Sequence, residues 1–179
     1  FMLPRSVYDA FNPLARARYW EYADGEFFGN GFDAWWCDCT EPLDADWRPM
    51  PEGYGWDSHK ERWKGNLALL DGVLGAERSS LFSLYHSKGL YENQRATTDR
   101  KRVVNLTRSS YAGQQRYSTI TWNGDTHASW KSFAQQIPQG LNFMATGCPY
   151  WTVDIGSFFT RKGREWFRAG DFDAGVDDM

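Results

Sequence analysis

The chain has 179 residues and a formal net charge of −3. That length can bury a sizeable core, and the net charge argues against nucleic acid or an anionic membrane surface as a partner. No apolar run approaches the roughly 20 residues that cross a bilayer. Aromatic residues make up 17% of the chain, with ten Trp, a composition that carbohydrate sites share with ordinary cores.

The first half of the chain contains one clear helix signal and one strand signal. Asn12-Pro13 predicts a helix start, with Asn as N-cap and Pro at the first helical position, and apolar residues at helical spacing follow as far as Phe27. Residues 32–37 form a short apolar run, typical of a buried parallel strand. Residues 43–75 are irregular, which indicates a long functional loop.

The second half alternates between strands and helices. Ser79 or Ser80 is predicted to cap a helix that carries Leu84 and Tyr91, and strands are predicted over residues 102–106 and 118–122. Ser129 predicts another helix, with Trp130, Phe133 and Ile137 on one side, which Pro138 should limit in length. Residues 150–153 form a fourth predicted strand. This alternation favours an α/β fold with a parallel sheet or barrel.

Polar residues follow each predicted strand: Asp38, Arg108, Asp125 and Asp154. In a (β/α)8 barrel the carboxyl ends of the strands share one rim, where active sites are built. The alternative is that these residues serve as turn residues and helix caps. Carboxylates on neighbouring strand ends can lie about 5 Å apart, as retaining glycoside hydrolysis requires. The acid of such a pair must keep its proton, which burial and a neighbouring negative charge favour.

The cysteines carry little chemistry of their own. Cys37, Cys39 and Cys148 are too few for a disulfide framework, and the histidines show no ligand spacing, so we expect neither a metal nor another cofactor. Strand alternation predicts that Cys37 and Cys39 point to one face and Asp38 to the other.

Four motifs in the correct order resemble glycoside hydrolase family 31. Trp36-Cys37-Asp38-Cys39-Thr40-Glu41-Pro42 resembles its nucleophile signature. Its acid/base region is matched by Leu106-Thr107-Arg108-Ser109, then Gly113-Gln114-Gln115-Arg116-Tyr117 and Trp122-Asn123-Gly124-Asp125. Residues 149–156 resemble the next strand, and residues 85–92 fit the intervening helix. The likeness extends from about residue 8 to residue 159.

The resemblance implies a (β/α)8 TIM barrel, of which residues 1–179 would form part of the catalytic domain, roughly strands 4 to 7. It implies that Asp38 is the nucleophile and Asp125 the general acid/base, with Glu41 supporting the nucleophile turn. The subsite for the cleaved sugar would be lined by Trp36, Cys39, Arg108, Trp122 and Asp154.

The identity of the sugar is less constrained than the mechanism. The Trp-Trp-x-Asp form with Thr-Glu-Pro resembles the α-xylosidase branch, ahead of α-galactosidase and α-glucosidase, and the departures at Cys39 and Asn123 bear on the sugar. Transglycosylation or lyase chemistry from the same intermediate stays open, as does a non-catalytic carbohydrate-binding module. The partner is a carbohydrate in each case, and the compartment is open, with secretion or the periplasm as options.

The chain is shorter than a complete barrel of roughly 250 residues. We therefore expect it to be the middle portion of a larger enzyme, with the remainder of the same polypeptide completing the barrel. Unpaired sheet edges in the isolated segment predict that it does not hydrolyse substrate alone.

Overall fold

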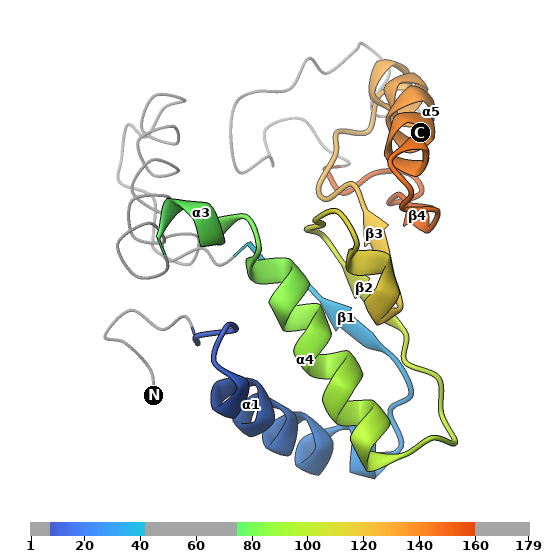
Figure 1. Cartoon of the computed structure of the whole chain (residues 1–179). Helices are drawn as coiled ribbons and strands as arrows, with labels where there is room; N and C mark the ends of the chain where they lie inside the picture. Colours follow the sequence, from blue (N-terminus) through green and yellow to red (C-terminus); the bar gives the residue numbers. More distant parts are fainter. Residues whose placement is uncertain (1–7, 42–74, 160–179) are drawn as a thin grey trace, which may run out of the picture.

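The computed structural model describes residues 8–41 and 75–159 of the chain (Figure 1). The elements follow in this order: α1 (Pro13–Glu26), η1 (Phe28–Asn30), β1 (Trp35–Cys37), α3 (Ala76–Ser79), α4 (Phe82–Thr97), β2 (Asn105–Thr107), η2 (Gln114–Tyr117), β3 (Thr119–Trp122), α5 (Trp130–Ala145) and β4 (Trp151–Thr152). The loop predicted over residues 43–75 lies outside the described residues, except for Gly75. No helix of the described ranges is long and apolar enough to cross a bilayer.

The four strands form one parallel sheet in the order β1-β2-β3-β4. Trp35 is in register with Asn105, which is in register with Thr119 on its other side. The predicted parallel sheet is therefore confirmed, and it places the carboxyl ends of all four strands along one edge. The strands are shorter than predicted. The ladder begins only where the Trp35 N–H donates to the Val104 carbonyl at 2.9 Å.

The start of α1 agrees with its prediction and the start of α4 does not. The Asn12 side chain accepts a hydrogen bond from the Leu14 N–H at 2.9 Å, as an N-cap residue does. The predicted cap at Ser79 or Ser80 is wrong, because residues 76–79 form the separate short helix α3. α4 begins at Phe82 after Leu81, with no side-chain cap.

α5 begins as predicted but runs further. The Ser129 hydroxyl accepts a hydrogen bond from the Ser132 N–H at 3.0 Å, and the helix continues through Pro138 to Ala145. The prediction that Pro138 limits the helix is wrong. Pro removes one backbone donor and clashes with the preceding turn, yet the helix continues past Pro138 and packs against β4.

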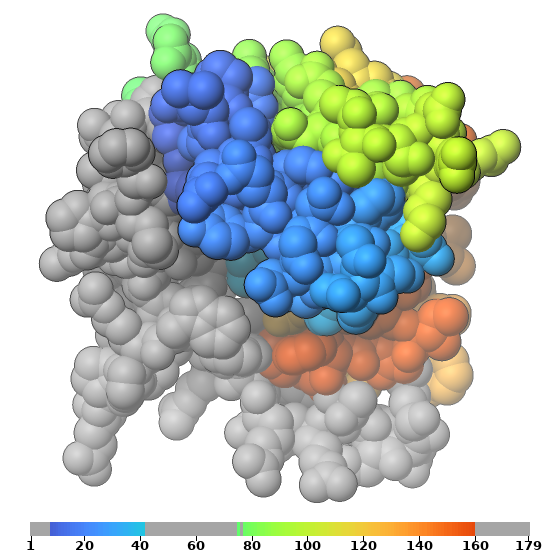
Figure 2. Space-filling model, turned by 90° about the horizontal axis from the view of Figure 1, so that it is seen from below, coloured from blue at the N-terminus to red at the C-terminus, as the bar shows by residue number. Residues whose placement is uncertain are grey.

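The hydrophobic core lies between the sheet and the helices α1 and α4. It joins Trp20 and Ala23 of α1, Phe28 of η1, Cys37 of β1 and Leu90 of α4. Figure 2 shows α1 and α4 side by side on one face of the molecule. Because side chains alternate along a strand, Trp36, between Trp35 and Cys37, points to the opposite face of the sheet.

Candidate active site

The parallel register brings the predicted residues to one edge of the sheet. Asp38 follows β1 directly, Arg108 follows β2 directly, and Asp125 and Asp154 lie two or three positions beyond the ends of β3 and β4. These groups interact electrostatically, since the charges of Arg108, Asp38 and Asp154 each affect the pKa of Asp125. The strand-end placement predicted from the sequence is therefore what the fold produces.

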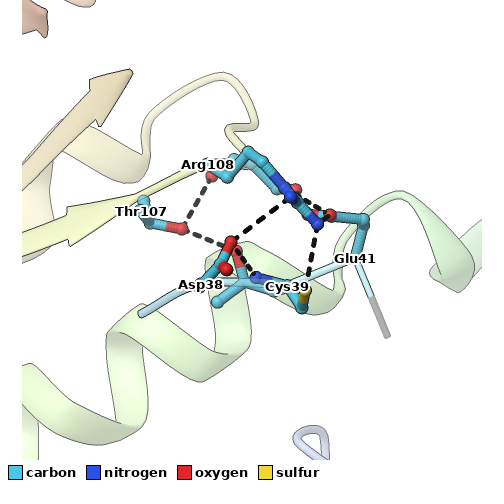
Figure 3. A network of polar contacts seen from close by, with 7 residues as sticks. Asp38, Cys39, Glu41, Thr107 and Arg108 are labelled. Carbon is cyan, nitrogen blue, oxygen red and sulfur yellow. Dashed lines mark hydrogen bonds and ion pairs between the residues drawn. The ribbon is translucent and has the colours of Figure 1, made fainter. Parts of the chain in front are cut away.

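The turn after β1 is joined to the end of β2 by a network of polar contacts (Figure 3). The hydroxyls of Thr40 and Thr107, both buried, lie 2.6 Å apart. The Arg108 Nε donates to Glu41 Oε1 at 2.7 Å, and its Nη2 donates to the same oxygen. The other oxygen, Glu41 Oε2, accepts from the Ser109 hydroxyl. These contacts fix the position of the turn that carries Asp38.

Arg108 is held more closely by Glu41 than by Asp38. Its Nη1 lies 3.4 Å from Asp38 Oδ1, and the same oxygen accepts the Cys39 N–H at 2.8 Å. Desolvation of the largely buried guanidinium acts to lower the pKa of Arg108. The hydrogen bonds and charge of Glu41, with smaller contributions from Cys39 and Asp38, raise it further than desolvation lowers it. The cation therefore stays charged beside the carboxylates.

The two predicted catalytic carboxylates do not follow neighbouring strands. β2 lies between β1 and β3, and Arg108 stands at its end, between the turn of Asp38 and the loop of Asp125. The expectation that the two carboxylates follow neighbouring strands is wrong, because hydrogen bonding in the folded sheet places β2 between β1 and β3. The cation between the carboxylates limits their mutual repulsion.

Asp125 is in an environment that favours its protonated form. Burial raises the pKa of its carboxyl above its ordinary value, and the negative charges of Asp38, Asp154 and Glu41 raise it further, while Arg108 opposes them. The sequence predicted both burial and the charge of Asp38 as causes. This direction of shift is the one that a general acid needs near neutral pH.

Asp154 joins the same group of charges from the end of β4. Burial and the charge of Asp38 raise the pKa of its carboxyl. Asp38 is nearly half exposed, with 45% of its side chain accessible. Within one site the carboxylates thus differ in solvent access, which is how proteins assign acid and nucleophile roles to chemically identical groups.

Two predicted aromatic residues lie on the sheet face opposite the core. The rings of Trp36 and Trp122 are 6.0 Å apart. Trp36 is 69% exposed and Trp122 only 4% exposed. Trp36 therefore offers a free ring face within the described part of the chain, whereas Trp122 packs beneath it. Contact between Trp122 and a sugar stays a prediction.

The two neighbouring cysteines lie in different surroundings. Cys37 is buried in the core, and burial raises the pKa of its thiol to about 12. Cys39 is beyond the strand, with a left-handed φ of 51°, and its sulfur lies 3.0 Å from Arg108 Nη2. The prediction that both thiols share one face is wrong, because strand alternation ends at Cys37.

A glycine allows the loop after β3 to approach Arg108. Gly124 has φ +75°, and a Cβ at this position would lie 3.0 Å from Arg108 Cδ. The residue before Asp125 is thus packed on the stem of Arg108. The sequence predicted neither this contact nor the partnership of Glu41 with Arg108 and Ser109. The only sequence signal that pointed toward these contacts was that polar residues follow the predicted strands. No group of three potential metal ligands occurs among residues 8–41 and 75–159.

Comparison with known proteins extends the likeness over nearly the whole chain. The family described as "Glycosyl hydrolases family 31 TIM-barrel domain" matches residues 3–173. An α-xylosidase from Saccharolobus solfataricus is 40% identical over 154 residues, which are 84% of this chain and 19% of that protein. The α-xylosidase A of Aspergillus niger is 32% identical over 84% of this chain and 21% of its own length. The chain spans about a fifth of these curated relatives.

Solved structures resemble the fold as well. The crystal structure of a GH31 α-xylosidase from Xanthomonas citri aligns with a TM-score of 0.67 and 36% identity, over 86% of this chain and 16% of that one. A GH31 α-xylosidase from a soil metagenome, complexed with xylose, aligns with a TM-score of 0.64 and 29% identity, over 84% of this chain and 20% of that one. The sheet described above therefore corresponds to a segment of their barrels. The chain belongs to glycosyl hydrolase family 31 and forms part of the family's TIM-barrel domain.

Proposed function

We propose that the protein containing this chain is a retaining α-glycosidase that releases terminal α-linked xylose. Asp38 would attack the anomeric carbon while Asp125 protonates the leaving oxygen, and Asp125 would then take a proton from the water that hydrolyses the glycosyl-enzyme intermediate. The observation that carries this proposal is the difference between the two carboxylates. Asp38 is nearly half exposed beside Arg108, whereas burial and three negative charges raise the pKa of Asp125.

The remaining predicted residues would bind the sugar. The exposed ring of Trp36 offers a flat apolar face to sugar C–H groups. Arg108 and Asp154 would supply a donor and an acceptor for hydroxyls, and Cys39 would border the same subsite. Xylose is supported by the relatives, two of which are α-xylosidases with 40% and 32% identity. An α-glucosidase from Saccharolobus solfataricus shows 28% identity.

Completion of the site would need further polypeptide. Trp36 is largely exposed, and so is the apolar side of α5, with Trp130 at 64% and Ile137 at 61%. In a closed barrel both faces of the strands are covered. We therefore expect the isolated 179-residue segment to lack activity that the full-length protein possesses.

Replacing each carboxylate in the full-length protein tests the mechanism. Asp38→Ala should abolish turnover of every aryl α-xyloside. Asp125→Ala should spare substrates with good leaving groups, and azide should restore the second step by attacking the intermediate without base catalysis. Asp33→Ala serves as the control, because Asp33 precedes the same strand but pairs with Lys101 at the surface. Near-normal turnover of poor leaving groups by both active-site variants would refute the assignment.

Two further measurements test retention and the sugar. A fluorinated α-xylosyl fluoride should label the peptide that contains Asp38, and the first sugar released should have the α configuration by NMR. A panel of aryl α-xylosides, α-glucosides and α-galactosides should show the highest kcat/KM for xylose. A preference for another sugar would refute the specificity and leave the mechanism intact.

A further inference from the structure

The carboxylate of Glu41 accepts hydrogen bonds from two consecutive residues after β2, Arg108 and Ser109. Its Oε1 accepts two N–H groups of Arg108, and its Oε2 accepts the Ser109 hydroxyl. About a quarter of the Glu41 side chain and a fifth of the Arg108 side chain are exposed. Ion pairs with this arrangement are more directional than surface pairs, because both oxygens are used and solvent is partly excluded.

The hydrogen bonds to Glu41 determine which nitrogen of the Arg108 guanidinium faces Asp38. Nε and Nη2 are directed to Glu41, and Nη2 also lies 3.0 Å from the Cys39 sulfur. Nη1 is then left at 3.4 Å from Asp38 Oδ1, whereas charge-assisted N–H···O bonds measure about 2.7–2.9 Å. Arg108 therefore attracts the Asp38 carboxylate without a close hydrogen bond to it.

An arginine without Glu41 would have a different preferred partner. The guanidinium fork matches a carboxylate in a bidentate pair, and Asp38, at the end of the neighbouring strand β1, is the carboxylate within reach of Arg108. Such a pair would engage both oxygens of Asp38 and lower their reactivity toward a sugar carbon. The carboxylates of Asp38 and Glu41 thus compete for one cation.

We infer that Glu41 is a positioning residue of the proposed glycosidase, which it serves by holding Arg108 away from a bidentate pair with Asp38. This inference rests on the proposed function. It assigns to Glu41 a part in the reactivity of Asp38 and not only in the shape of the turn.

The charges around Asp125 supply a second readout, the pH dependence of activity, beside the rate at which Asp38 is labelled, which reports the pairing of Arg108 directly. Asp125 faces Arg108 from the end of β2, Asp38 and Glu41 from the turn after β1, and Asp154 from the end of β4. Glu41→Gln removes one negative charge that raises the pKa of Asp125 and leaves the opposing charge of Arg108 uncompensated. The pKa of Asp125 should therefore fall.

The sign of the pH effect follows directly. A general acid must be protonated, so activity is lost as pH rises through the pKa of Asp125. A lower pKa moves the alkaline limb of kcat/KM to lower pH. Glu41 makes the smallest of the contributions that act on the pKa of Asp125, so we expect a small but measurable shift of the alkaline limb to lower pH.

The experiment compares variants of the full-length protein on an aryl α-xyloside with a poor leaving group. Glu41→Gln keeps the length of the side chain and loses the charge, so kcat/KM should fall roughly 10- to 100-fold with a shifted alkaline limb. Glu41→Asp keeps the charge and loses reach, so the rate should fall with little shift. Glu92→Gln is the matched control, since Glu92 pairs with Lys88 on the exposed side of α4, and neither quantity should change.

The outcomes separate this inference from the proposed function. Wild-type rate and pH profile in folded Glu41→Gln, with Asp38→Ala inactive, would overturn the positioning role and leave the glycosidase standing. Absence of turnover in the wild-type protein would overturn both. If Glu41→Gln does not fold, Glu41→Asp tests the inference instead. An unchanged kcat/KM in Glu41→Asp would contradict the view that the carboxylate must reach Arg108. Slower labelling of Asp38 by the fluorinated xylosyl fluoride in Glu41→Gln would support the competition for Arg108.

Discussion

Replacing Gly124 by Ala should damage the site more than the fold. Gly124 has φ +75°, and the added Cβ would lie 3.0 Å from Arg108 Cδ and 3.3 Å from its Cγ. The left-handed backbone alone destabilises an L-residue by roughly 1–2 kcal/mol. The contact also requires the stem of Arg108 to move by a few tenths of an ångström. Because a misplacement of about 1 Å lowers rates by roughly 100-fold, we expect a fall in kcat/KM of about 3- to 10-fold together with a small loss of thermal stability.

Gly31→Ala separates these two effects. Gly31 has φ +101°, and a Cβ added there would meet nothing within 4 Å, so this position carries the backbone penalty without the clash. Both variants of the full-length protein should show similar falls in melting temperature, and only Gly124→Ala should turn over an aryl α-xyloside more slowly. Equal kcat/KM in the two variants would refute the view that the stem of Arg108 must stay in place.

Three further predictions concern the fold and are checked by denaturant or thermal unfolding. Pro138→Ala should stabilise α5 by about 1–3 kcal/mol, because it restores a helical N–H; no gain over Gln139→Ala would contradict this. Leu90→Ala should destabilise by roughly 2–5 kcal/mol, because Leu90 is 2% exposed in the core, whereas exposed Leu14 should tolerate the same change. Burial lowers the pKa of His86 to about 4, so stability should fall as pH drops from 6.5 toward 4, where the unfolded chain binds the extra proton. That dependence should weaken in His86→Phe, and its persistence would point to another group.

Local signals in the sequence were sufficient where a helix end depends on its own residues. Asn12 and Ser129 cap α1 and α5 as predicted, since each accepts a backbone N–H two or three residues ahead. Ser79 and Ser80 offered the same chemistry, yet α4 starts at Phe82. The two serines inside α4, Ser83 and Ser87, hydrogen-bond to the buried Gln114 of η2 and so tie the helix to a distant segment of the chain. Such tertiary partners cannot be inferred from the cap pattern.

The site was predictable to the extent that it depends on strand ends. Parallel strands place their carboxyl ends together, so Asp38, Arg108 and Asp125 could be grouped from the sequence. The position of β2 between the two carboxylates could not, because strand order is decided by packing. The choice of Glu41 over Asp38 as the closer partner of Arg108 depends on a difference between distances of 2.7 and 3.4 Å, which no sequence pattern encodes.

The chain-ordered sheet also has a consequence for the order of folding. The register partners Asn105 and Thr119 are 14 positions apart, whereas Trp35 and Asn105 are 70 apart. Closing the longer loop is less favourable by about 1.4 kcal/mol at equal flexibility, so β2 and β3 should pair before β1 joins them. Pulse-labelled hydrogen exchange should then show protection of the Asn105 amide, which donates to the Ser118 carbonyl, before that of the Trp35 amide, which donates to the Val104 carbonyl. Simultaneous protection of the two amides would contradict this order. The turn carrying Asp38 would be the last to dock, onto an edge where Arg108 is already in place.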